Sequence, residues 1–293
     1  MKQQLTIAMS IINKVKLPKI SNEVTVLQNE SLKPEPDVNV IVSCIQRNPK
    51  LFTKFLAVAS FMTKKEVTSA KQAVSILGTK GVFTVFFSSA IEFSFKSHSD
   101  SELMINHAIK MATAMAELAG NMKGFPVSDA YLYGLVYNIG YVVLHDYSAQ
   151  RAKSCYLNSL TYPSKAEQLE METFGTTNAH IGIYVAKKWR VKNSIYCGIL
   201  FQNKEIEKCD KGLNKAYELN HLLNVARMVV AETESQRYIT NEVKDLAVNS
   251  MQHLDLTHLQ CARAQQKVKK FTADLQSSNQ KMWQESMTES AAY

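Results

Sequence analysis

Turn-forming residues are scarce in this chain of 293 residues, which contains only 10 glycines and 6 prolines. A β-sandwich or β-barrel of this length needs many tight turns, and glycine and proline form most of them. The hydrophobic share of 46% is ample for a packed core. The composition therefore predicts a folded, all-α protein.

Periodic apolar residues, separated by capping and turn signals, predict where the helices lie. Asp37 and Asn48 are expected N-caps, and Pro49 suits a first helical position. Gly78 is expected to end its helix in a left-handed conformation, and Pro18 should break the chain. The expected helices cover approximately residues 5–15, 22–30, 38–45, 51–61, 73–77, 82–95, 105–119, 132–139, 181–189, 194–202, 213–234, 241–252 and 257–275.

The formal net charge of +8 favours an anionic partner, such as a nucleotide, a nucleic acid or an acidic protein surface. The basic residues are scattered and not interleaved with aromatic residues, so nucleic-acid binding is the weaker alternative. No apolar run approaches the roughly 20 residues that a membrane-spanning helix needs. The five cysteines lie far apart without a CxxC pair, which favours reduced thiols and a cytoplasmic location.

Several enzyme classes have no support in the sequence. There is no nucleophile-elbow motif, no Walker-type GK[ST] loop and no GxGxxG motif. Acyl transfer, P-loop nucleotide hydrolysis and dinucleotide-dependent redox chemistry are therefore set aside.

An ordered set of motifs runs along the chain: Leu17–Ile20, Asn48–Leu51, Leu56–Ser60, Ala73–Gly78, Gly134–Gly140, Glu172–Gly182 and Trp189. This set resembles the HDOD family (HD-related output domain), a bacterial signalling module related to the HD phosphohydrolases. The resemblance implies a two-lobed helical bundle over 17–275, with an N-terminal lobe at 17–98 and an HD-like lobe at 99–275. Residues 1–16 are expected to form a separate amphipathic helix, and 276–293 a flexible tail.

The resemblance also shows which positions would carry metal ligands in a catalytic HD protein, where histidines and aspartates hold the metal that activates water. His107 falls at the first histidine position. The other positions hold Tyr137 and Asn138 for the His-Asp pair, Asn178 for the next histidine, Gln202 and Asn203 for a histidine pair, and Arg227 for the last aspartate. Amides are weak neutral ligands, a tyrosine stays protonated near neutral pH, and an arginine repels a metal. We therefore expect no catalytic residue, no metal and no cofactor.

The substituted positions allow two interpretations. The polar side chains could satisfy one another as a structural network, or together with Arg227 they could bind an anionic nucleotide second messenger. His107 is expected to be a hydrogen-bonded histidine at a helix interface. The dipeptide His145–Asp146 lies eight residues beyond the family position, and we interpret it as a surface or helix-end pair.

Two functions follow from the resemblance. The first is a non-catalytic signal-transduction module that binds signalling proteins, such as sensor kinases or cyclic-dinucleotide enzymes. The alternative is a residual or remodelled metal-dependent phosphohydrolase built around His107.

Overall fold

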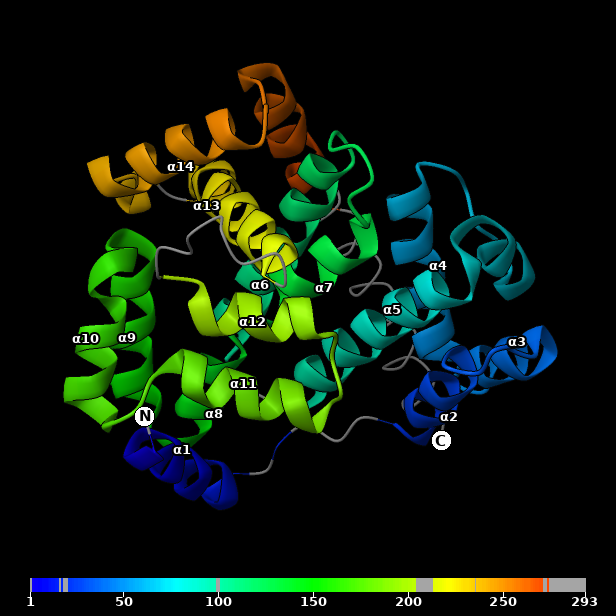
Figure 1. Ribbon diagram of the computed structural model, residues 1–293, viewed down its shortest axis with the longest axis horizontal. Helices are drawn as coiled ribbons and strands as arrows, with labels where there is room; N and C mark the ends of the chain where they lie inside the picture. Colours follow the sequence, from blue (N-terminus) through cyan, green and yellow to red (C-terminus); the bar gives the residue numbers. More distant parts are fainter. Residues whose placement is uncertain are drawn as a thin grey trace, which may run out of the picture.

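The computed structural model describes residues 2–15, 17, 21–98, 101–203, 213–234, 236–270 and 273, and it is shown in Figure 1. The expected break at Pro18 and the expected flexible tail at 276–293 lie outside the described residues.

The described residues form helices and no strands, which confirms the all-α prediction. Residues 258–270 form a further helix after α14. The bounds are α1 Lys2–Lys14, α2 Asn22–Ser31, α3 Val38–Gln46, α4 Pro49–Thr63, α5 Ala70–His98, α6 Glu102–Ala119, α7 Val127–Val136, α8 Ile139–Tyr147, α9 Ala149–Thr161, α10 Pro163–Phe174, α11 Asn178–Lys188, α12 Asn193–Phe201, α13 Asn214–Glu234, η1 Gln236–Tyr238 and α14 Asn241–His253.

Two groups of helices are joined by α5 (Figure 1). Helices α2, α3 and α4 pack against α5 on one side, and α5 also contacts α6 and α7 of the larger group. Asp37 and Asn48 cap α3 and α4 as predicted, accepting hydrogen bonds from the main-chain N–H groups of Asn39 and Leu51. Helices α3 and α4 therefore begin where the capping signals predicted.

Gly78 has the expected positive φ, but the helical path resumes directly after it. Its φ of 67° and ψ of 169° produce a kink inside α5 rather than an end. A Cβ atom at this position would meet nothing within 4 Å, so the backbone conformation alone requires glycine here.

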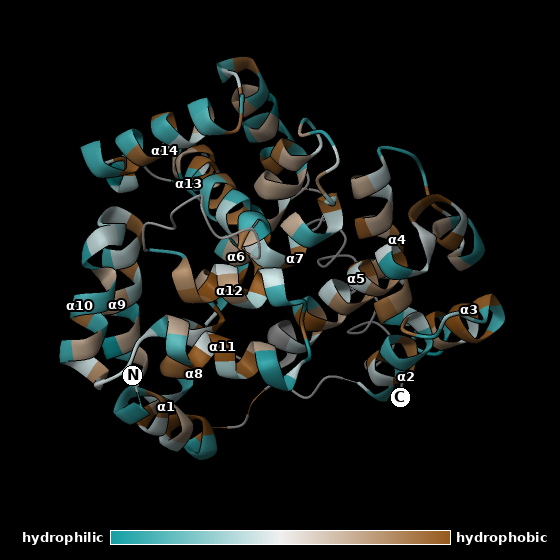
Figure 2. Cartoon of the chain, in the orientation of Figure 1, coloured by the Kyte–Doolittle hydropathy of each residue, from teal (hydrophilic) through white to brown (hydrophobic). Residues whose placement is uncertain are grey.

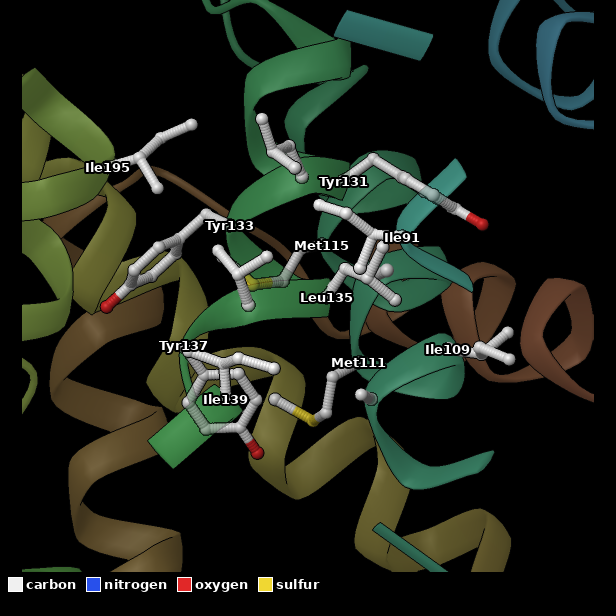
Figure 3. Close-up of a cluster of buried hydrophobic side chains, with 14 of the residues drawn as sticks. Ile91, Ile109, Met111, Met115, Tyr131, Tyr133, Leu135, Tyr137, Ile139 and Ile195 are labelled. Atoms are coloured by element: carbon white, nitrogen blue, oxygen red, sulfur yellow. The ribbon is translucent and has the colours of Figure 1, made fainter. Parts of the chain in front are cut away.

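The centre of the larger group is the α6–α7 pair. Small residues allow a close approach, because a Cβ atom on Gly134 would lie 2.6 Å from the Cα of Ala112. The rings of Tyr131 and Tyr133 leave α7 toward opposite sides in Figure 3, and both side chains are buried. Helix α7 therefore contributes polar groups to two separate parts of the interior.

Helix α1 packs against α8 and α11 of the larger group (Figure 1). It buries Ala8, Ile11 and Ile12, and the Thr176 hydroxyl donates to the carbonyl of Gln4 at 3.0 Å. Figure 2 shows mainly hydrophilic residues along α14 at the edge of the molecule. The apolar face of α1 therefore points toward the interior.

The helix predicted over 132–139 is confirmed up to Val136, where α7 ends, but its continuation to Ile139 is wrong, because the helix is interrupted at Tyr137 and Asn138 before α8. The side chain of Asn178 stabilises the break by donating to the Tyr137 carbonyl and accepting from the Tyr141 N–H. These contacts come from a distant segment, so local periodicity could not indicate them.

Helices α9 and α10 were not predicted. The buried face of α9 has regular helical spacing, but it contains Cys155, Tyr156 and Ser159 among its apolar residues. The buried face of α10 contains Glu170 between Ala166 and Phe174. Polar members of both faces weakened the hydrophobic pattern.

By its length and composition alone, the segment Ala70–Ser94 could cross a membrane. We had predicted no apolar run that approaches a membrane-spanning helix. More than half of its most apolar stretch is buried inside the fold. That burial is typical of a core helix.

Candidate functional site

Asn178 is the centre of a polar network between α8, α10 and α11. It follows Thr177, whose hydroxyl caps α11 by accepting from the His180 N–H at 3.1 Å. The Asn178 side chain is 2% exposed, and its amide Nδ2 donates to the Asn138 Oδ1 at 3.1 Å. Its Oδ1 accepts from the Tyr141 N–H at 3.1 Å. The amide is thus used to fix the α7–α8 break.

Glu170 joins the same network, although it was not among the predicted residues. Its Oε2 accepts from the Asn178 N–H at 2.7 Å, and its Oε1 accepts a short hydrogen bond from the Tyr141 hydroxyl. Burial disfavours the charged form and raises the pKa of Glu170 to about 7. The only sequence signal for this role was a carboxylate on an otherwise apolar helix face.

The raised pKa of Glu170 predicts a pH-dependent stability. Relative to an ordinary value of 4.5, the folded state binds an extra proton between about pH 4.5 and 7, so this stabilisation is lost as the pH rises through 7. From pH 5.5 to 8.0 the unfolding free energy should fall by about 2 kcal/mol more in the native chain than in the variant Glu170→Gln.

Chemical denaturation of both proteins at the two pH values measures this difference. The other titrating groups are shared, so they cancel in the comparison. Equal pH dependence in the two proteins would contradict a raised pKa at Glu170.

His107 lies at the interface of α6 and α13, apart from Asn178. Its Nδ1 is 2.8 Å from the Glu234 Oε2, and the Lys110 Nζ lies 2.9 Å from the Glu234 Oε1. Burial opposes the charge of Glu234, but the hydrogen bonds from His107 and Lys110 lower its pKa to about 2. Glu234 therefore stays ionised and orients the imidazole.

Three buried polar atoms near this histidine have no hydrogen-bond partner in the described part of the chain: the His107 Nε2 and the hydroxyls of Tyr137 and Tyr156. The rings of His107 and Tyr156 meet edge to face with centroids 6.0 Å apart. Desolvation raises the pKa of both tyrosines, so their hydroxyls stay protonated. These three atoms can form hydrogen bonds, but the two hydroxyls carry no negative charge that would attract a metal.

Arg227, Asn203 and Gln202 form a third part of the site. The Arg227 guanidinium donates to the Oδ1 atoms of Asn224 at 3.0 Å and Asn203 at 3.1 Å. Desolvation lowers its pKa from the usual value. Gln202 is 5% exposed, and it lines a pocket beside Glu170 and Asn203.

The structure thus places the predicted site residues in three separate hydrogen-bonded groups. Asn138 and Asn178 are directly bonded, Arg227 is bonded to Asn203, and His107 bonds to Glu234 instead. His145 and Asp146 lie at the C-terminal end of α8. Within the described ranges, no three His, Cys, Asp or Glu side chains are grouped closely enough to hold a metal ion.

Comparison with known proteins identifies the fold. No curated protein matches the chain, but residues 17–205 match the model of the HDOD domain family. An HDOD domain protein of unknown function from Geobacter sulfurreducens is 17% identical, with a TM-score of 0.64 over 93% of this chain and 97% of that chain.

Two further solved structures are similar. A Shewanella amazonensis SB2B protein, named as a candidate phosphohydrolase, is 18% identical with a TM-score of 0.59, over 89% of this chain and 98% of that chain. A Marinobacter aquaeolei VT8 protein, named as a candidate signal transduction protein, is 19% identical with a TM-score of 0.60, over 92% of this chain and 66% of that chain. At these identities the structures show a shared fold, and the family match covers more than half of the sequence. The chain belongs to the HDOD domain family, as its motifs predicted.

Proposed function

We propose that this protein is a non-catalytic signal-transduction module that acts by binding other signalling proteins. The observation that carries the proposal is the use of the Asn178 amide. At a position where the resemblance places a metal-binding histidine, this side chain bonds to Asn138 and to the backbone of the α7–α8 break. Its oxygen accepts a hydrogen bond from the Tyr141 N–H, so it is used to stabilise the fold rather than to bind a ligand.

The other replaced positions support the same conclusion. Tyr137 is a protonated phenol, and the Arg227 cation would repel a divalent metal. Membership of the HDOD family fits a regulatory role, and the similar Marinobacter structure is named as a candidate signal transduction protein. Sensor kinases and cyclic-dinucleotide enzymes are the partner classes that we propose.

A specific observation favours one alternative, a residual metal-dependent phosphohydrolase. Metal-binding histidines commonly donate one ring N–H to a carboxylate while the other nitrogen binds the metal. His107 has this arrangement, with Nδ1 bonded to Glu234 and Nε2 unpartnered. A single imidazole is nevertheless too few ligands for a hydrolytic metal.

Metal analysis and a phosphodiesterase assay separate these functions. The purified chain, supplied with manganese or iron, should show no turnover of bis(p-nitrophenyl) phosphate above the rate of His107→Ala. Affinity capture from a bacterial cytosol should recover signalling proteins. Stoichiometric metal together with turnover that His107→Ala abolishes would instead establish the phosphohydrolase.

A further inference from the structure

Helices α13 and α14 meet through a cluster of three rings. The imidazoles of His221 on α13 and His253 at the end of α14 are stacked, with centroids 4.4 Å apart and planes 19° from parallel. The Tyr217 ring stands edge-on to both, 4.3 Å from the His221 centroid and 4.8 Å from that of His253. Two groups that can each gain a positive charge are therefore held face to face where the helices meet.

The hydrogen bonds around His221 fit its neutral form. A guanidinium only donates, so Asn224 turns its Oδ1 to Arg227 at 3.0 Å and its Nδ2 to the Ser250 Oγ at 3.3 Å. The Ser250 hydroxyl accepts from Asn224 and is left to donate its own proton to the His221 Nδ1 at 3.0 Å. A protonated Nδ1 cannot accept that proton. Because Ser250 is 1% exposed, its hydroxyl would then lose its acceptor in a buried position.

In the described part of the chain, no carboxylate bonds to either histidine to offset a positive charge. Glu218 precedes His221 by one turn on α13 without forming an ion pair with it. The charged and titratable groups of the other elements near α13 and α14 meet different partners: His107 and Lys110 of α6 meet Glu234, Tyr133 of α7 meets Asn220, Cys197 of α12 meets Asn193, Arg237 of η1 meets Tyr238, His258 of the last helix acts on Glu232, and Glu242 of α14 meets the Ser164 N–H.

The surroundings of His221 oppose its charged form. Burial, and after it the neighbouring His253, lower the pKa of His221 from its ordinary 6.5 to about 4. When α14 is detached, His221 regains water and its ordinary pKa, so the detached form binds more protons between about pH 4 and 6.5. The contact is therefore fully stable above pH 6.5 and weakens as the pH falls from there toward 4.

Helix α14 is held by a narrow face. Its buried residues are Val243, Ala247 and Ser250. Mainly hydrophilic residues run along the rest of this helix at the edge of the molecule (Figure 2). Protonation of His221 acts on Ser250, one of the three residues that hold the helix. An element with so few buried apolar residues can separate without unfolding the core.

We propose that the stacked His221–His253 pair is an acid-sensitive latch, which keeps α14 on α13 while the imidazoles are neutral and releases α14 when both become protonated. Two positive rings 4.4 Å apart repel each other, and Ser250 loses its acceptor at the same time. Release exposes the α13 face that carries His221 and Asn224. The latch concerns regulation of this domain and does not depend on the proposed function.

Hydrogen exchange followed by mass spectrometry tests the latch in the full chain. After correction for the intrinsic exchange rate at each pH, lowering the pH from 7.5 to 5.0 should reduce the protection of α14 amides about twentyfold. The amides of α4, which contains no histidine, should change by less than about threefold. Protection of α14 that does not depend on pH would overturn the proposal.

Two variants assign the effect to the pair. In His221→Gln, whose side-chain oxygen can still accept from Ser250, the protection of α14 should change by less than about threefold between the two pH values. His145→Gln is the matched control, because it removes another half-buried histidine, at the end of α8, and should keep the native response. A native response in His221→Gln would overturn the latch.

The exposed variant His253→Gln keeps the test decisive if His221→Gln fails to fold. Removing the second charge should make the loss of α14 protection at least about threefold smaller. An unchanged loss would overturn the pairing of the two histidines.

NMR of the full chain with ¹³C-labelled histidine follows the protonation of His221 directly. Its signal, identified by its loss in His221→Gln, should titrate well below pH 6.5 and move upward in His253→Gln. Titration of His221 at its ordinary value in the native chain would overturn the proposal. Because neither method measures phosphodiester turnover or partner capture, the latch can fail while the proposed function holds.

Discussion

Replacing Gly140 with alanine should unfold this protein or lower its unfolding free energy by at least about 3 kcal/mol. The new Cβ atom would lie 2.2 Å from the main-chain oxygen of Asn178 and 2.7 Å from its Oδ1. Because a backbone atom stands in the way, no side-chain rotation relieves the overlap. Helices α8 and α11 would have to separate, which would break the Asn178–Tyr141 hydrogen bond.

Denaturant unfolding followed by circular dichroism measures the effect. Gly120→Ala is the control, because Gly120 ends α6 with an ordinary φ of −61° and a Cβ atom there would come no closer than 3.3 Å to any other residue. The control should change the unfolding free energy by less than about 1 kcal/mol. Similar values for the two variants would contradict the close approach of α8 and α11.

Replacing Glu92 with alanine is expected to lower the unfolding free energy by about 3 to 5 kcal/mol. Glu92 is fully buried on α5, where its carboxylate meets the Lys54 Nζ of α4 at 2.5 Å and the Tyr131 hydroxyl of α7 at 2.6 Å. The truncation leaves the buried Tyr131 hydroxyl and the largely buried Lys54 ammonium, whose side chain is 13% exposed, without their acceptor. This carboxylate also joins the two groups of helices, so α4 and α7 should loosen together.

The double variant Lys54→Met with Glu92→Leu distinguishes a lost charge partner from lost packing. Removing both charges leaves no unpaired ammonium, so the double variant should recover much of the stability that Glu92→Ala loses. Exposed Glu35→Ala serves as the control for a carboxylate removed from the surface. A loss below about 1 kcal/mol for Glu92→Ala would show that this contact contributes little to stability.

The sequence by itself determined the helical class, the family and most helix positions. Scarce glycine and proline and regular apolar spacing are local properties, and capping side chains such as Asp37 and Asn48 bond to backbone two or three residues away. Features that depend only on residues close together in the sequence can be predicted without knowing the fold. The family motifs likewise singled out Asn138, Asn178 and Arg227 as polar residues that we expect to replace metal ligands.

Only the tertiary structure decided how those residues are used. The α7–α8 break is fixed by Asn178, which lies about 40 residues away along the chain from the groups it bonds. Glu170 and Glu234 were not predicted, because the position of a carboxylate in a helix does not tell which distant group it will meet. Hydrogen bonds and desolvation depend on distances of a few ångströms between segments far apart in sequence, and those distances exist only after the helices have packed.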